Sequence, residues 1–219
     1  MHEKTLLTVL TVLFFAPMAF AGNWGAGIKA GIGENDPKTL NDGYHNEIGD
    51  RDLTESDGFF GLEALYEHNL TNYDKIGIRL GVDFYGENEL EVTSRLSNEK
   101  EDATENTYAI PLTVYYKRDN GVKNWSFFAG AGITYIHSEL EYESENLMGM
   151  DKEEFSISKS KIFPHIMAGT EYRFSELFAL GLEAKYNFSA KTEKNYEGLN
   201  VVLSDRSGLS GAVTARFYF

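Results

Sequence analysis

Residues 213–219 read VTARFYF, a stretch in which the side chains alternate in character with a period of two. In an extended chain, Val213, Phe217 and Phe219 fall on one face, and the residues between them, which include Arg216, fall on the other. A strand with one wholly apolar face and one mixed face is typical of barrels whose two sides meet different surroundings. The stretch therefore predicts a β-strand that turns one side toward lipid.

Residues 1–21 have the features of a cleaved signal peptide. Lys4 gives a basic start, residues 6–15 form an apolar core, and Ala19-Phe20-Ala21 is a small-x-small cleavage pattern. The apolar run is too short for a membrane-spanning helix, and Pro17 follows it. We expect export through this leader and a mature domain of residues 22–219.

Seven earlier segments alternate in the same way as the last one, and each has about the 9–11 residues that a tilted transmembrane strand needs. These segments are Trp24–Ile32, Phe60–Glu67, Ile76–Phe84, Tyr108–Lys117, Trp125–Tyr135, Ile162–Phe174 and Phe178–Phe188. Short connections alternate with long ones, as periplasmic turns alternate with extracellular loops in bacterial barrels. The sequence predicts an all-β, eight-stranded, antiparallel, up-and-down transmembrane β-barrel.

The alternation alone also fits a soluble secreted barrel with an apolar interior, such as a lipocalin. Two features favour the membrane. Glycines such as Gly27, Gly81 and Gly132 gather on the polar parity, which suits a narrow interior. Aromatic residues on the apolar parity gather at both strand ends, as in the girdles that mark the two membrane interfaces. We therefore expect an integral protein of an outer membrane, in a Gram-negative type of envelope.

Composition excludes several other classes of protein. The chain has no cysteine, which rules out a disulfide framework, a lipoprotein anchor and a thiolate metal site. Its formal charge of −14 argues against nucleic acid, which needs a basic footprint. No segment has the spacing of a calcium loop, so we expect no metal and no cofactor.

Four stretches of this chain resemble the small outer-membrane β-barrel family of the OmpX and OmpA transmembrane-domain type. The stretches are Tyr108–Lys117, Phe127–Tyr135, Ala168–Arg173 and Ala215–Phe219, and the likeness covers residues 22–219. The resemblance implies that Phe217 and Phe219 form the signal read by the barrel-assembly machinery. Thr214 stands where the family pattern often has glycine, so this signal departs from the usual one.

The polar parity predicts a charged barrel interior, because eight strands enclose a space that side chains just fill. Six cations and five carboxylates fall on this parity, and in a narrow interior of low dielectric they should pair with one another. The predicted network consists of Lys29, Glu63, Glu67, Arg79, Asp83, Lys117, Glu171, Arg173, Glu183, Lys185 and Arg216. A paired network closes the interior, whereas rearranged pairs would leave a narrow pore for ions or small solutes.

The negative charge is concentrated in three predicted extracellular loops, 34–57, 86–107 and 136–161, with net charges of −6, −5 and −4. These loops would be solvated or would bind extracellular proteins or cations. The alternation in Glu139–Glu143 predicts strands that continue beyond the membrane and pair with another protein's edge. We expect a monomer with a structural or surface-interaction role.

The sequence does not predict an enzyme. His137 and Ser138 lie near the expected outer rim, where a histidine–serine pair could meet lipid. Neighbours in a strand point to opposite faces, so this imidazole and hydroxyl cannot meet as base and nucleophile. His165 falls on the inward parity, where a hydrogen-bonded core histidine is the expected role.

Overall fold

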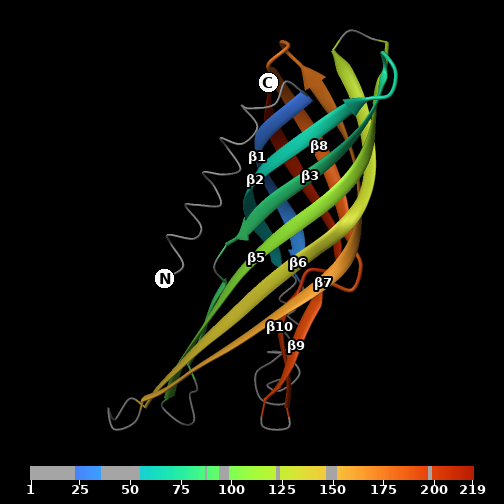
Figure 1. Cartoon of the computed structure of the whole chain (residues 1–219). Coiled ribbons are helices and arrows are strands. Elements are labelled where there is room, and N and C mark those ends of the chain that lie inside the picture. The colour runs from blue at the N-terminus through green and yellow to red at the C-terminus, as the bar shows by residue number, and fades with distance from the viewer. Residues whose placement is uncertain are drawn as a thin grey trace.

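The chain folds into eleven β-strands within residues 23–35, 55–86, 88–93, 99–121, 124–146, 152–196 and 199–219, which a computed structural model describes. The strands are β1 Asn23–Asn35, β2 Glu55–Asn69, β3 Asp74–Tyr85, β4 Asn88–Thr93, β5 Glu99–Asp119, β6 Trp125–Asn146, β7 Lys152–Arg173, β8 Phe178–Asn187, β9 Lys191–Tyr196, β10 Leu199–Asp205 and β11 Gly208–Tyr218. Eight of them form a barrel, while β4, β9 and β10 lie beyond one of its ends (Figure 1).

Two pairings close the barrel. Strands β1 and β11 pair antiparallel, with Ile28 opposite Ala215, and β3 pairs with β5, with Leu80 opposite Leu112. The remaining barrel strands pair with their neighbours in chain order, all of them antiparallel. Every barrel strand therefore has a partner on both sides for at least part of its length. The predicted eight-stranded antiparallel barrel is confirmed.

Exposure alternates along the strands as the sequence pattern predicts. In β8, Glu183 and Lys185 are buried inside the barrel, whereas Leu180 and Leu182 are exposed on its outer wall. Large apolar residues cover that wall from every side, among them Ile28, Ile78, Val114, Phe127, Ile133, Ile166, Leu182 and Val213. The soluble-barrel alternative is wrong, because it requires these residues to fill the interior.

Aromatic rings border the apolar wall at both ends. Near the short turns, the ring centroids of Trp24 and Tyr66 are 4.9 Å apart, and that of Trp125 is 5.1 Å from Tyr172. Toward the other end, the ring centroid of Tyr108 lies 6.4 Å from that of Tyr135. Such rings favour the two membrane–water interfaces, and the wall between them is apolar. No helix in the described part of the chain has the length and hydropathy to cross a membrane.

The short turns lie together at one end of the barrel and are fixed by local hydrogen bonds. Thr71 Oγ1 accepts from the backbone N–H of Tyr73 at 3.2 Å and of Asp74 at 3.0 Å. Ser175 Oγ similarly accepts from the N–H of Phe178 at 3.1 Å. Barrels of this kind turn their short connections toward the periplasm, and we call this the periplasmic end.

Most of the predicted extracellular loops are strand rather than loop, which corrects the sequence interpretation. Strands β5 and β6 pair without interruption from Asp119 opposite Ser126 to Glu99 opposite Asn146, because the barrel ladder simply continues. Strand β4 adds to β5, and residues 152–161 of β7 add to β6. The segment 189–207 contains the hairpin β9–β10. Of the predicted loop 34–57, residues 36–54 lie outside the described residues.

We call the projecting sheet the blade, and it consists of β4 with residues 99–107 of β5, 138–146 of β6 and 152–161 of β7. Figure 1 shows the blade leaning away from the barrel at the end opposite the C-terminus. The predicted continuation of the strand through Glu139–Glu143 is confirmed. Apart from β4, the blade is thus formed by continuations of barrel strands.

Replacing Val114 by arginine tests the inside–outside assignment. The Val114 side chain is 52% exposed on the outer wall. Arginine there should lower the free energy of unfolding by about 2–4 kcal/mol, because a charge must enter the hydrocarbon layer. Urea titration in lipid vesicles measures the loss. The control His68→Arg, at the periplasmic rim, should cost about 0–1 kcal/mol, and equal losses for both would contradict the assignment.

Gly132 tests how tightly the interior is packed. A Cβ built on Gly132 would collide with the carbonyl oxygen of Leu112 and lie 2.8 Å from Thr113 Cα, and backbone atoms cannot yield as a side chain can. Gly132→Ala should therefore lower stability by about 1–3 kcal/mol through overpacking. Gly58→Ala is the control, because no atom lies within 4 Å of its Cβ position. Unfolding in lipid vesicles that gives the same stability for both variants would contradict this packing.

Candidate functional site

The barrel interior gathers the charged residues that the sequence placed on the polar parity. Ten of the eleven predicted network residues are buried and form ion pairs with one another. The eleventh, Arg173, lies at the periplasmic mouth with its side chain 32% exposed. The ten form three tiers along the barrel, each supplied by several strands.

The middle tier is built around Arg216 of β11. Its Nε donates to Glu63 Oε1 at 2.5 Å, its Nη1 to a Glu171 oxygen at 3.1 Å and its Nη2 to Glu183 Oε2 at 3.2 Å. Arg79 Nη1 lies 2.6 Å from the same Glu183 oxygen and 3.2 Å from Glu63. Two guanidinium groups thus hold carboxylates from β2, β7 and β8 across the interior.

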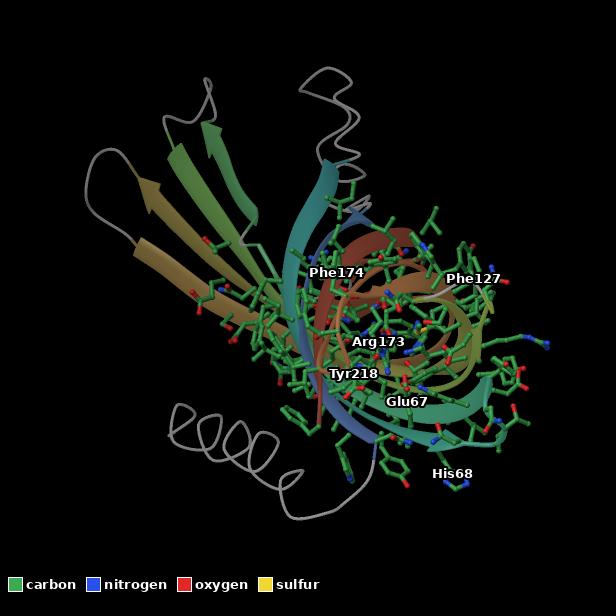
Figure 2. All side chains as sticks on the ribbon, turned by 90° about the horizontal axis from the view of Figure 1, so that it is seen from above. Glu67, His68, Phe127, Arg173, Phe174 and Tyr218 are labelled. Carbon is green, nitrogen blue, oxygen red and sulfur yellow. The ribbon has the colours of Figure 1, made fainter. Side chains whose placement is uncertain are left out.

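The periplasmic tier is built around Lys117 of β5. Its Nζ lies 3.0 Å from Glu67 Oε1 and 2.6 Å from Glu171 Oε1. The Tyr218 hydroxyl donates to Glu171 at 2.7 Å, and the Tyr115 hydroxyl donates to Glu67 at 3.1 Å. Both carboxylates therefore have cationic and hydroxyl partners. Figure 2, seen from the periplasmic end, shows Glu67, Tyr218 and Arg173 inside the ring of strands.

The third tier lies toward the blade and has one carboxylate between two ammonium groups. Asp83 Oδ1 is 2.7 Å from Lys29 Nζ, and its Oδ2 is 3.3 Å from Lys185 Nζ. Lys29 Nζ also lies 5.8 Å from the ring centroid of Phe59, which is buried. Across the three tiers, five nearly buried cations face five buried carboxylates, so the interior is close to neutral.

The interior contains the hydrogen-bonded core histidine that the sequence predicts, together with partners that the sequence did not identify. His165 is held between two threonines, with 2.8 Å from its Nε2 to Thr113 Oγ1 and from its Nδ1 to Thr134 Oγ1. In the sequence, only its inward parity indicated this position. The two hydroxyl groups give both ring nitrogens of His165 a hydrogen-bond partner. At the blade end, Ala109, Ile136, Phe163 and Ala190 form an apolar cluster.

The segment that contains the β9–β10 hairpin contributes a cation at the blade end of the barrel. Arg206, which follows β10, lies with its guanidinium carbon 3.8 Å from the ring centroid of Tyr85. Arg206 lies in the connection between the predicted strand Phe178–Phe188 and the last strand, and no periodicity in that connection pointed to the barrel mouth. The backbone N–H of Ala190 donates to Ser207 Oγ at 2.8 Å, which joins the two ends of the hairpin segment. This hairpin therefore helps to close the interior.

The described side chains leave little free space between the middle and periplasmic tiers of the interior. Between the middle and periplasmic tiers there is a cavity of about 10 Å³, which is at most the room for one water molecule. Residues from all sides border it, including Leu65, Arg79, Tyr115, Phe128 and Met167. The described structure is thus a barrel closed by side chains at this level.

A histidine–serine contact does occur on the outer wall, though not between the pair considered from the sequence. Ser138 is buried and bonds Thr107, whereas His137 Nδ1 lies 2.8 Å from Ser160 Oγ on the neighbouring strand. The Tyr135 hydroxyl donates to the same oxygen at 2.8 Å. In the described residues no carboxylate bonds His137, and no group of three or more metal-ligating side chains occurs there.

Substitution of Arg216 tests how far the interior depends on its middle tier. Arg216→Met should lower the free energy of unfolding by about 3–5 kcal/mol, because it removes a buried positive charge that three buried carboxylates share and leaves one negative charge of the interior unbalanced. Arg118→Met is the matched control, since this arginine is 67% exposed and 3.8 Å from Asp74, so its loss should cost about 0–1 kcal/mol. Comparable urea midpoints for both variants in lipid vesicles would contradict the network.

No curated protein matches the chain by sequence. Solved structures that are similar include Neisserial surface protein A (12% identity, TM-score 0.49, covering 90% of this chain and 97% of that chain). They also include a major outer membrane protein of Thermus thermophilus (14%, 0.49, 90% and 99%) and Ail of Yersinia pestis in complex with the heparin analogue sucrose octasulfate (12%, 0.46, 91% and 99%).

A family model, that of the outer membrane protein beta-barrel domain, matches residues 5–217 and so spans almost the entire sequence. The closed antiparallel barrel, its apolar outer wall and its charged interior are the features that this family requires in lipid. The chain therefore belongs to the outer-membrane β-barrel protein family.

Proposed function

We propose that this protein is a closed membrane anchor that presents an acidic sheet, the blade, for interactions at the cell surface. In this proposal the barrel fixes the protein in the outer membrane as a monomer, and its contacts are with basic segments of extracellular proteins or with cations. The same proposal assigns the protein no enzymatic activity. The partners are those expected from the acidic segments of the sequence.

A row of acidic residues across the blade is the basis of this proposal. The strand register places Glu91 of β4, Asp102 of β5, Glu143 of β6 and Glu154 of β7 in a single row across the blade. Like charges directly opposite each other destabilise a sheet. A basic partner laid along this row would relieve that repulsion, so the row favours binding of positive charge.

The closed interior supports the anchor role over the pore alternative. The three tiers of ion pairs and the cavity of about 10 Å³ leave no continuous path at the level of the middle tier. A pore would need several buried pairs to separate together, and each separation would leave an uncompensated charge in a low-dielectric interior.

The outer-wall contact between His137 and Ser160 supports no catalytic role. A nucleophilic serine needs a base that a third group orients, and His137 has no carboxylate partner among the described residues. An oxyanion hole needs free donors aimed at the reacting carbonyl. Backbone N–H groups of a sheet point in its plane toward the neighbouring strands, and His137 has a paired strand on both sides.

Binding of a basic peptide tests the surface role. Purified protein in a neutral detergent should bind oligolysine with an affinity that falls as salt rises, because the attraction is electrostatic. The blade variant E139Q/E141Q/E143Q should bind at least about tenfold more weakly, since each lost charge removes part of that attraction. Isothermal titration calorimetry measures both proteins.

The matched control is E47Q/D50N/D52N, which removes the same number of charges from the segment 36–54. It should bind nearly as well as the unchanged protein, and equal losses for both triple variants would show that net charge rather than the blade is responsible. Planar-bilayer recordings separate the anchor from the pore. We expect no steady conductance, and stable channels would overturn the closed-anchor proposal.

A further inference from the structure

A pocket at the periplasmic end lies outside the interior network. Its volume is about 290 Å³, close to the lower bound of about 300 Å³ for small-ligand sites. It is formed where the β2–β3 turn meets the β5–β6 turn, and the N–H of Asp119 donates to the carbonyl of Tyr73 at 2.8 Å to join them. The lining residues are Asn72, Tyr73, Asp119, Gly121, Asn124, Trp125, Ser126 and Arg173.

Arg173 gives this pocket a cation that the interior does not use. The nearest carboxylate, Glu171, is 3.8 Å from Arg173 Nη2, beyond hydrogen-bond distance. Glu171 already has Lys117 at 2.6 Å and Arg216 at 3.1 Å. The guanidinium instead rests on the ring of Tyr218, with 4.3 Å from its carbon to the ring centroid. Arg173 thus lines the pocket without a carboxylate at hydrogen-bond distance among the described residues.

The other walls of the pocket carry complementary chemistry. Asp119 supplies a carboxylate, and Asn72 and Asn124 supply amide groups. Tyr73 and Trp125 are 58% and 41% exposed, and their rings can accept an organic cation on their faces. A simple anion would be repelled by Asp119, and a simple cation would be repelled by Arg173. A ligand with both charges, held a short distance apart, satisfies both.

We propose that this pocket binds a phosphate–ammonium zwitterion of the phosphoethanolamine type. The phosphate lies at Arg173, whose planar fork suits two phosphate oxygens. The ammonium lies between Asp119 and the aromatic rings. The same chemistry occurs in a phosphoethanolamine lipid headgroup and in a free phosphoethanolamine ester, and the position of the pocket beside the periplasmic aromatic girdle brings it level with lipid headgroups.

The test uses tryptophan emission from the pocket itself. The chain has two tryptophans, so Trp24→Phe leaves Trp125 as the reporter. The protein, in a neutral sugar detergent, is titrated with glycerophosphoethanolamine and with glycerophosphate, which lacks the ammonium. We expect saturable emission changes with both probes and tighter binding of glycerophosphoethanolamine.

Three substitutions test which residue binds the phosphate and which residue binds the ammonium group. Arg173→Gln should weaken both probes by about tenfold or more, because it removes charge-assisted hydrogen bonds to phosphate. Asp119→Asn should weaken only the ethanolamine probe and should strengthen glycerophosphate. Arg118→Gln is the matched control, since Arg118 adjoins Asp119 in sequence but does not line the pocket, and it should change neither affinity.

The outcomes are distinct. The proposal fails if neither probe gives a saturable change, or if R118Q weakens binding as much as R173Q. Should R173Q not fold, the opposite responses of the two probes to D119N decide the matter, and equal responses would overturn the zwitterion assignment. Competition by short-chain phosphatidylethanolamine identifies a lipid headgroup as the ligand, whereas binding of the soluble probe without such competition identifies a free ester.

Discussion

Closure of the backbone ladder is the constraint on which the whole molecule depends. Lipid offers no hydrogen bonds, so every N–H and C=O group within the membrane needs a partner in the chain. The pairing of β1 with β11 and of β3 with β5 supplies the last of these partners. The resulting wall is apolar on its outer face. The side chains of the opposite parity are confined to a narrow interior.

That confinement explains the charges. Eight strands leave room only for side chains, and charges within such a space are stable only in pairs. The arginines at 79 and 216 and the lysines at 29, 117 and 185 meet five carboxylates from other strands. The interior is therefore a filled, nearly neutral core that is rich in polar groups, and the outer wall is apolar.

The sequence allowed the barrel to be predicted because each membrane strand must alternate in a strict period of two. The same alternation assigned to the inward parity the ten charged residues that lie inside the barrel, although it gave no information on which cation meets which carboxylate. Arg173 follows the parity but lies at the mouth, because β7 ends at that residue. The parity of a residue fixes its side of the sheet, and its depth depends on where the strand ends.

The blade was predicted only in part, through the alternation in Glu139–Glu143, because the rest of its sequence has the acidic composition of a loop. In 99–107 and 138–146 nearly every second residue is charged, and such composition is typical of solvated loops. The register that joins β4, β5, β6 and β7 depends on the barrel below, which aligns the strands before they leave the membrane. The periplasmic pocket is formed by two turns from separate hairpins, and local sequence does not show that they meet.

The interior network has a consequence for the order in which the protein is assembled. Arg216 belongs to β11, and its partners come from β2, β7 and β8, the farthest of them 153 positions earlier in the chain. Until β11 docks, each of these carboxylates lacks one of its two nearest cationic partners, and the unbalanced charge must remain hydrated. A partly assembled barrel therefore holds water where the finished one holds ion pairs. Insertion of β11 completes the backbone ladder and expels that water at the same time. Closure of the barrel and drying of its interior therefore form a single cooperative step.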